Sequence, residues 1–155
     1  MIKKVLIIFS LAMGKAMFSQ IPERIEFESF NSIAIDNVNI VLTPIKNNIK
    51  GKVRVRFTNK ENSFTRRISQ KEYINISTNI LSIKQKISFN AKDSIKTRCL
   101  DGSSIEITIF QNNIKKKYFL DCISPEDKME EERKDFWYAT KLILETVRIK
   151  IENLY

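Results

Sequence analysis

Strict alternation of apolar and polar residues is the feature that most constrains the fold of this chain. Residues 52–57 alternate without a break, and residues 24–30, 38–42 and 104–110 follow the same pattern. Because successive side chains of a β-strand point to opposite faces, each segment is predicted to form a strand with one buried face. Clean alternation is typical of antiparallel sheets that are covered on one side only. The chain is therefore expected to form such a sheet, with a polar second face.

The best-defined hairpin is predicted at residues 104–120. Asn112 and Asn113 supply a tight turn between its strands, because asparagine tolerates the positive φ angles that such turns require. Pairing the strands outward from this turn places Tyr118 opposite Ile107 on the apolar face. The two strands are therefore expected to be neighbours in the sheet.

A second hairpin is predicted to join residues 52–57 to residues 63–68. Pairing Phe57 with Phe64 also places Val53 opposite Ile68. Apolar residues then face one another across the two strands, as in a buried surface of a sheet. The same register turns Arg66 toward the core. The sequence therefore predicts either a bulge beside this arginine or a different register.

Two further strand predictions are less regular. Residues 33–42 are expected to form a strand, but the apolar phase slips at Asp36 and Asn37, so a turn or bulge is predicted there. A short strand is expected near Ile87–Phe89, before a polar loop.

Two helices are predicted from capping signals and helical spacing. Ser69 and Glu72 match a capping box, and the apolar residues behind them repeat at helical intervals, which predicts a helix over about 70–82. Proline and acidic residues follow Ser124, as at a helix start, and the longer helix is predicted over about 131–153. The expected fold class is α+β: an antiparallel sheet of hairpins with one face covered by these two helices.

Residues 1–20 are predicted to be a secretory signal peptide, which leaves residues 21–155 as a single domain. Two lysines precede an apolar run of about nine residues, which is too short to span a bilayer as a helix. Cleavage is expected after Ala16 or Ser19, and no nearby cysteine could accept a lipid. The alternative is a buried N-terminal helix or a retained anchor. The mature protein is expected to be periplasmic or secreted in a bacterium, with no transmembrane segment.

Cys99 and Cys122 are the only cysteines. In an oxidising compartment an even pair is typical of a disulfide, which is therefore the expected state. A turn at Asp101 and Gly102 would bring Cys99 back to the open end of the hairpin predicted at residues 104–120. The alternative is a redox or metal-binding pair, but the sequence has no CxxC motif and no second cluster of ligands.

Two absences restrict the chemistry that the chain can perform. The sequence has no histidine, which excludes histidine-based triads and HExxH zinc sites. Outside the leader it has only Gly51 and Gly102, which are too far apart for a phosphate-binding loop or a dinucleotide fingerprint. Carboxylates or lysine could still support catalysis, but no pair is nominated by its position. The protein is not expected to be an enzyme, and no cofactor or metal is predicted.

The first candidate site is the polar face of the predicted sheet. In the register that pairs Phe57 with Phe64, Arg54 lies directly opposite Arg67, and like charges in that position are destabilising. A bound anion would compensate for them. The predicted anion-binding residues are Lys52, Arg54, Arg56, Arg67 and Lys117. The alternative is that Glu26, Glu28 or Glu106 pairs with these cations, or that the cations are simply solvated.

Two weaker candidates complete the search. The acidic run between Glu126 and Asp135 offers oxygen ligands for a hard cation, but it is interrupted by basic residues and also suits a helix N-terminus. Four aromatic residues could line a groove, although such spacing is more typical of core positions. They are Tyr118, Phe119, Trp137 and Tyr138.

The sequence therefore favours a small exported protein that acts by binding or by structure, not by catalysis. One version is an inhibitor or accessory factor that contacts a protein of the bacterial envelope. The alternative is a basic module that binds an anionic polymer or an anionic lipid surface, as the formal net charge of +9 suggests. Cleavage of the leader would lower this charge to +6, because three lysines leave with it.

Overall fold

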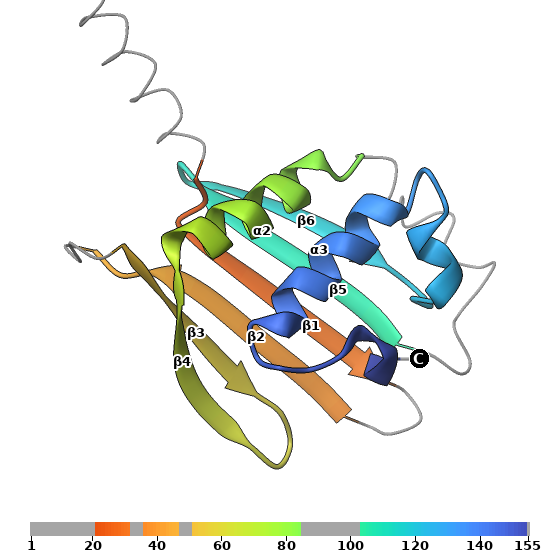
Figure 1. Ribbon diagram of the computed structural model, residues 1–155, viewed down its shortest axis with the longest axis horizontal. Coiled ribbons are helices and arrows are strands. Elements are labelled where there is room, and N and C mark those ends of the chain that lie inside the picture. The colour runs from red at the N-terminus through yellow and green to blue at the C-terminus, as the bar shows by residue number, and fades with distance from the viewer. Residues whose placement is uncertain (1–20, 32–35, 47–50, 85–102, 155) are drawn as a thin grey trace, which may run out of the picture.

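The computed structural model describes residues 21–31, 36–46, 51–84 and 103–154. In these ranges the chain forms one antiparallel sheet of six strands with two α-helices on one face (Figure 1). The strands are β1 (Arg24–Asn31), β2 (Asp36–Pro44), β3 (Lys52–Thr58), β4 (Ser63–Ser69), β5 (Ser103–Gln111) and β6 (Ile114–Leu120). The helices are α2 (Gln70–Ser82) and α3 (Lys134–Glu145), with short 3₁₀ helices η2 (Pro125–Lys128) and η3 (Ile151–Leu154). The α+β fold predicted from the sequence is confirmed.

The strands are arranged in the order β4-β3-β2-β1-β5-β6. Strands that are consecutive in the sequence pair as hairpins, with the exception of β4 and β5. Instead, β5 pairs with β1, which therefore has β2 on one side and β5 on the other. Helix α2 follows β4 at one edge, lies across the sheet, and precedes β5 in the sequence (Figure 1). The four consecutive strands β1–β4 and the hairpin β5–β6 are thus joined side by side by the pairing of β1 with β5.

The predicted registers of both hairpins are confirmed. Phe57 pairs with Phe64 and Ile107 pairs with Tyr118. The two aromatic rings of the first pair are stacked, with centroids 4.8 Å apart. Asn112 and Asn113 have φ angles of 50° and 64° at the turn between β5 and β6, as the choice of two asparagines predicted.

The predictions about irregular strands are corrected in two places. Arg66 faces the helix side opposite Val55 with neither a bulge nor a change of register. It is tolerated because β4 is an edge strand, where a long side chain can reach solvent. Residues Asp36 and Asn37 pair continuously with β1, so the predicted bulge is not present there, and the described strand begins at Asp36.

Helix α2 has the bounds that the sequence predicted. The side chain of Ser69 accepts a hydrogen bond from the backbone N–H of Glu72 (3.2 Å), while the Glu72 carboxylate accepts one from the backbone N–H of Ser69 (2.7 Å). These hydrogen bonds satisfy amide groups that the first turn of a helix leaves without a partner. The apolar residues on one side of α2, including Tyr73 and Ile80, are buried against the sheet.

Helix α3 is shorter than predicted, and a separate short helix precedes it. The segment after Ser124 forms only the 3₁₀ helix η2, and α3 ends at Glu145. Arg148 then adopts a positive φ of 62°, which turns the chain so that Ile151 and Leu154 become buried. A straight helix of the predicted length would extend about 34 Å. It would overhang strands of eight residues, which span about 27 Å.

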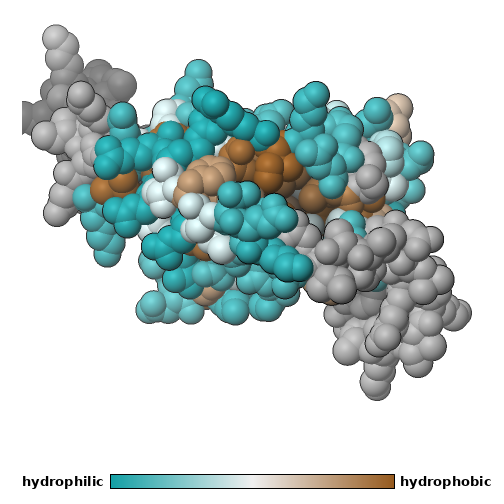
Figure 2. All heavy atoms as spheres, turned by 90° about the horizontal axis from the view of Figure 1, so that it is seen from below, coloured by the Kyte–Doolittle hydropathy of each residue, from teal (hydrophilic) through white to brown (hydrophobic). Residues whose placement is uncertain are grey.

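The core lies between the sheet and the helices. Along β3, Val53, Val55 and Phe57 are buried, and the intervening residues are exposed. Ile25 and Phe27 of β1 are fully buried at the centre of the sheet. Seen from below, hydrophobic residues gather near the middle of the molecule and are framed by hydrophilic ones (Figure 2).

Several predictions concern parts of the chain outside the described ranges. They are the signal peptide at residues 1–20, the strand near Ile87–Phe89, and the position of Cys99. Helices within the described ranges fall short of the length and apolarity needed to cross a membrane.

Candidate binding surface on the open face of the sheet

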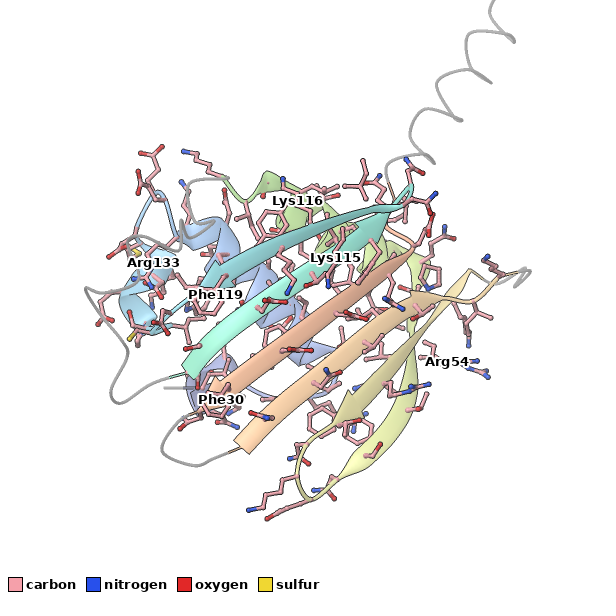
Figure 3. The ribbon with its side chains drawn as sticks, turned by 180° about the vertical axis from the view of Figure 1, so that it is seen from behind. Phe30, Arg54, Lys115, Lys116, Phe119 and Arg133 are labelled. Carbon is pink, nitrogen blue, oxygen red and sulfur yellow. The ribbon has the colours of Figure 1, made fainter. Side chains whose placement is uncertain are left out.

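The face of the sheet turned away from α2 and α3, which we call the open face, carries most of the charged side chains of the strands. Figure 3 shows this face from behind, with side chains projecting from all six strands and no helix over them. Its charged residues alternate along the strands with the buried residues of the other face. They are Arg24, Glu26, Glu28, Lys52, Arg54, Arg56, Arg67, Glu106, Lys115 and Lys117.

Four of the five predicted anion-binding residues lie together on β3 and β4, and we call them the basic cluster: Lys52, Arg54, Arg56 and Arg67. Arg54 is paired directly with Arg67, as the sequence predicted. All four residues are exposed, and none takes part in the ion pairs found among the described residues. Among the described residues, the cluster is therefore a local excess of positive charge that no carboxylate compensates.

Lys117 is not part of the basic cluster. It lies on β6, at the opposite edge of the sheet, and its ammonium group forms an ion pair with Glu106 at 2.6 Å. The hydrogen bond to Glu106 raises the pKa of Lys117. For Glu106, partial burial alone would raise the pKa, but hydrogen bonds from Lys117 and Thr108 outweigh it and lower the pKa. Of the five predicted residues, Lys117 is thus separated in space and neutralised.

The carboxylates expected as alternative partners for the cations are used elsewhere. Glu26 pairs with Arg24 of its own strand, with 3.0 Å between the carboxylate and the Nε atom. Glu28 accepts a hydrogen bond of 3.3 Å from the amide of Asn39. Only the pair of Glu106 with Lys117 matches that alternative, so the basic cluster stays without a carboxylate partner in the described part of the chain.

Sequence reasoning missed a continuation of positive charge across the sheet. Arg24 and Phe110 are paired on β1 and β5, and Lys115 is paired with Phe110 on β6. Arg24 lies over the ring of Phe110 at 4.0 Å from its centroid, and the ammonium group of Lys115 lies 5.6 Å from it. Alternation could place these residues on the polar face, but only the pairing of β1 with β5 brings them into line.

The end of the open face away from these cations is different in character. A depression of about 710 Å³ lies there, with Glu28, Glu106, Phe30 and Phe119 among its lining residues. Phe30 is 48% exposed. Glu28 is paired directly with Glu106, so the two ends of the face carry like-charge pairs of opposite sign.

The acidic run before α3 has structural roles. The buried carboxylate of Asp127 accepts a hydrogen bond from the backbone N–H of Ser124 and forms an ion pair with Arg133 at 2.8 Å. Burial raises the pKa of Asp127 against the effect of these two partners. Glu131 pairs with Lys84 at 3.0 Å. The described residues contain no group of three or more potential metal ligands.

The four aromatic candidates do not form one groove. Tyr118 and Trp137 are buried in the core between sheet and helix, whereas Phe119 belongs to the open face. Tyr138 is exposed on α3, with its ring edge-on to Trp137. Cys122 lies just after β6 with a positive φ of 56°, and its predicted partner Cys99 is outside the described residues, so the disulfide stays a prediction.

Chemically, the open face offers fixed cations that can bind phosphate, sulfate or carboxylate groups. Arginine is suited to this because its guanidinium fork binds such anions through two parallel hydrogen bonds. Comparison with known proteins gives no further guidance: no protein-family model matches the chain, and no significantly similar sequence is found among curated proteins.

Proposed function

We propose that this chain is a non-catalytic binding protein whose basic cluster binds an anionic polymer. The observation that carries the proposal is the direct pairing of Arg54 with Arg67 on an uncovered face, with Lys52 and Arg56 beside them. Like charges in such pairs destabilise a sheet. The described residues supply no carboxylate to offset them, so an external anion is the natural partner.

The proposal is tested by binding to an immobilised sulfated polysaccharide of the heparin type at increasing salt concentration. The double variant Arg54→Gln/Arg67→Gln should elute at clearly lower salt than the wild type. Plotted as log affinity against log salt, its slope should be smaller by about 2, because each lost ionic contact removes about one unit.

The matched control is Lys128→Gln/Lys150→Gln, which removes the same charge from exposed positions away from the open face. It should behave almost like the wild type. Equal losses in both double variants would mean that net charge alone drives retention. That result would overturn the assignment of a site to the basic cluster.

We further propose that the protein works outside the cytoplasm, after removal of residues 1–20. This rests on the leader-like sequence of that segment and on the even number of cysteines. N-terminal sequencing of the protein recovered from the periplasm or the medium should begin after Ala16 or Ser19. An uncut N-terminus in the cytoplasmic fraction would contradict it.

A second candidate function is favoured by the depression lined by Phe30 and Phe119. Exposed aromatic residues in a concave, partly polar surface are typical of protein-binding sites, so an accessory factor that binds an envelope protein is the alternative. Phe30→Ser should abolish co-purification with one such protein while leaving retention on the sulfated polysaccharide unchanged. Retention lost together with co-purification would favour a single site.

A further inference from the structure

We infer that the anionic polymer is a narrow, linear acidic polysaccharide that crosses the strands along one row of the open face. This row, the basic row, takes one residue from each strand: Arg67, Arg54, Thr43, Arg24, Phe110 and Lys115. Strand pairing connects Arg67 with Arg54, Arg54 with Thr43, Arg24 with Phe110 and Phe110 with Lys115. Thr43 follows Leu42, the partner of Ile25, and so stands beside Arg24. The inference rests on the proposed function of the basic cluster.

The length of the basic row sets the size of the ligand. Neighbouring strands lie about 4.8 Å apart, so the five steps from Arg67 to Lys115 span about 24 Å. A single phosphate or sulfate group would cover one or two strands. Only a chain of several charged units can contact both Arg67 at one end and Lys115 at the other.

The far half of the row is pre-organised around Phe110. Its ring attracts the guanidinium group of Arg24 at 4.0 Å and the ammonium group of Lys115 at 5.6 Å, which holds two like charges in line. The ion pair of Arg24 with Glu26 uses the Nε atom. The side chain of Arg24 is 44% exposed, so an anion can still reach its guanidinium group beside this ion pair.

The charges beside the row favour a narrow chain over a broad anionic surface. Glu26 lies two residues further along β1, and Glu28 and Glu106 lie beyond it on the same face. A membrane or a nucleic acid duplex laid over the sheet would be repelled by Glu28, which takes part in none of the ion pairs among the described residues. A chain confined to the basic row passes beside these carboxylates.

The aromatic residue of the row argues against a single-stranded nucleic acid. Such ligands gain much of their affinity by stacking bases on free aromatic faces. Phe110 is engaged by two cations, and the other members of the basic row are not aromatic. Sugars with sulfate, phosphate or carboxylate groups need only the cations and hydrogen bonds that this row offers.

The test compares Arg24→Gln/Lys115→Gln with the wild type on sulfated oligosaccharides of increasing length, measured by calorimetry. Wild-type affinity should rise with length until the ligand spans about 24 Å and then level off. The double variant should bind the longest ligand at least about tenfold more weakly, because it loses two ionic contacts. It should bind a disaccharide, which contacts the basic cluster alone, as well as the wild type does.

Controls separate failure of the row from failure of the proposed function. The variant Arg24→Lys/Lys115→Arg keeps both charges and should retain the length dependence, and unchanged circular dichroism would show that each variant is folded. Equal binding of the long ligand by wild type and Arg24→Gln/Lys115→Gln would overturn the row but leave the basic cluster intact. No binding of any length by the wild type would overturn both.

Two further probes test the chemical class of the ligand. Single-stranded oligodeoxythymidylate and vesicles of phosphatidylglycerol and phosphatidylcholine should bind more weakly than the long sulfated oligosaccharide at equal salt. Tighter binding of either probe would overturn the polysaccharide assignment.

Discussion

The two faces of the sheet are built from alternate residues of the same strands, yet they have opposite properties. On β3, Val53 and Val55 are buried beneath the helices, whereas Lys52, Arg54 and Arg56 project into solvent. The covered face is mainly apolar, although Ser29 of β1 and Ser103 of β5 are buried on it. The open face tolerates two like-charge pairs, Arg54 with Arg67 and Glu28 with Glu106. The buried apolar contacts thus lie on one face, which leaves the other free to carry unfavourable charge.

The largest expected effect comes from breaking the covered face at its centre. Phe27 is fully buried on the central strand β1, so Phe27→Ala should lower the free energy of unfolding by about 4 kcal/mol. Its neighbour Glu28 points to the open face, and Glu28→Ala should change that free energy by less than about 0.5 kcal/mol. Urea denaturation of both variants measures the difference. Similar losses would contradict the division of roles between the faces.

The second effect tests whether the covered face needs covalent support near its edge. If Cys99 and Cys122 are linked, reduction should lower the free energy of unfolding by about 3 kcal/mol. Mass spectrometry of peptides from the exported, unreduced protein should show the linked pair. Two free thiols in that sample would contradict both the disulfide and the argument for export.

A smaller effect is expected where the chain passes from the sheet to its cover, at the cap of α2. Ser69→Ala should lower the free energy of unfolding by about 1 kcal/mol, because one backbone N–H of α2 loses its partner. Hydrogen bonds from the Ser69 side chain and backbone lower the pKa of Glu72.

The lowered pKa of Glu72 gives the cap a defined pH dependence. Its contribution to stability is fully present above the ordinary value of 4.5 and is lost as the pH falls through the lowered pKa of the folded state. Glu72→Gln should therefore flatten the loss of stability in this acidic range, as followed by thermal unfolding at several pH values. An unchanged pH profile would show that Glu72 is not responsible.

The smallest effect has the opposite sign and sharpens the comparison most. Arg54→Gln should raise the free energy of unfolding by about 0.5 kcal/mol, because it removes one member of a like-charge pair. The same variant should weaken retention on the sulfated polysaccharide. A gain in stability together with a loss in binding is the signature of a charge kept for function, and a loss in both would indicate a structural role for Arg54.

Much of the fold could be predicted because its signals are local. The alternation in β3, the two asparagines between β5 and β6, and the Ser69 capping box each fix a short segment through contacts within that segment. The register that pairs Arg54 with Arg67 followed from those signals. The basic cluster was therefore predictable, except for Lys117, whose distance from it depends on strand order.

The sequence by itself determined which residues are apolar, which are charged and which side of its strand each one takes. Only the tertiary structure decided which strands lie side by side, because the pairing of β1 with β5 joins segments distant in the chain. That pairing separates Lys117, which binds Glu106 within its own hairpin, from the basic cluster. It also aligns Arg24, Phe110 and Lys115 with the cluster. The tertiary structure also decided where α3 ends, because the burial of Ile151 and Leu154 requires the chain to turn after the helix. Long-range packing, which alternation and capping cannot encode, set both outcomes.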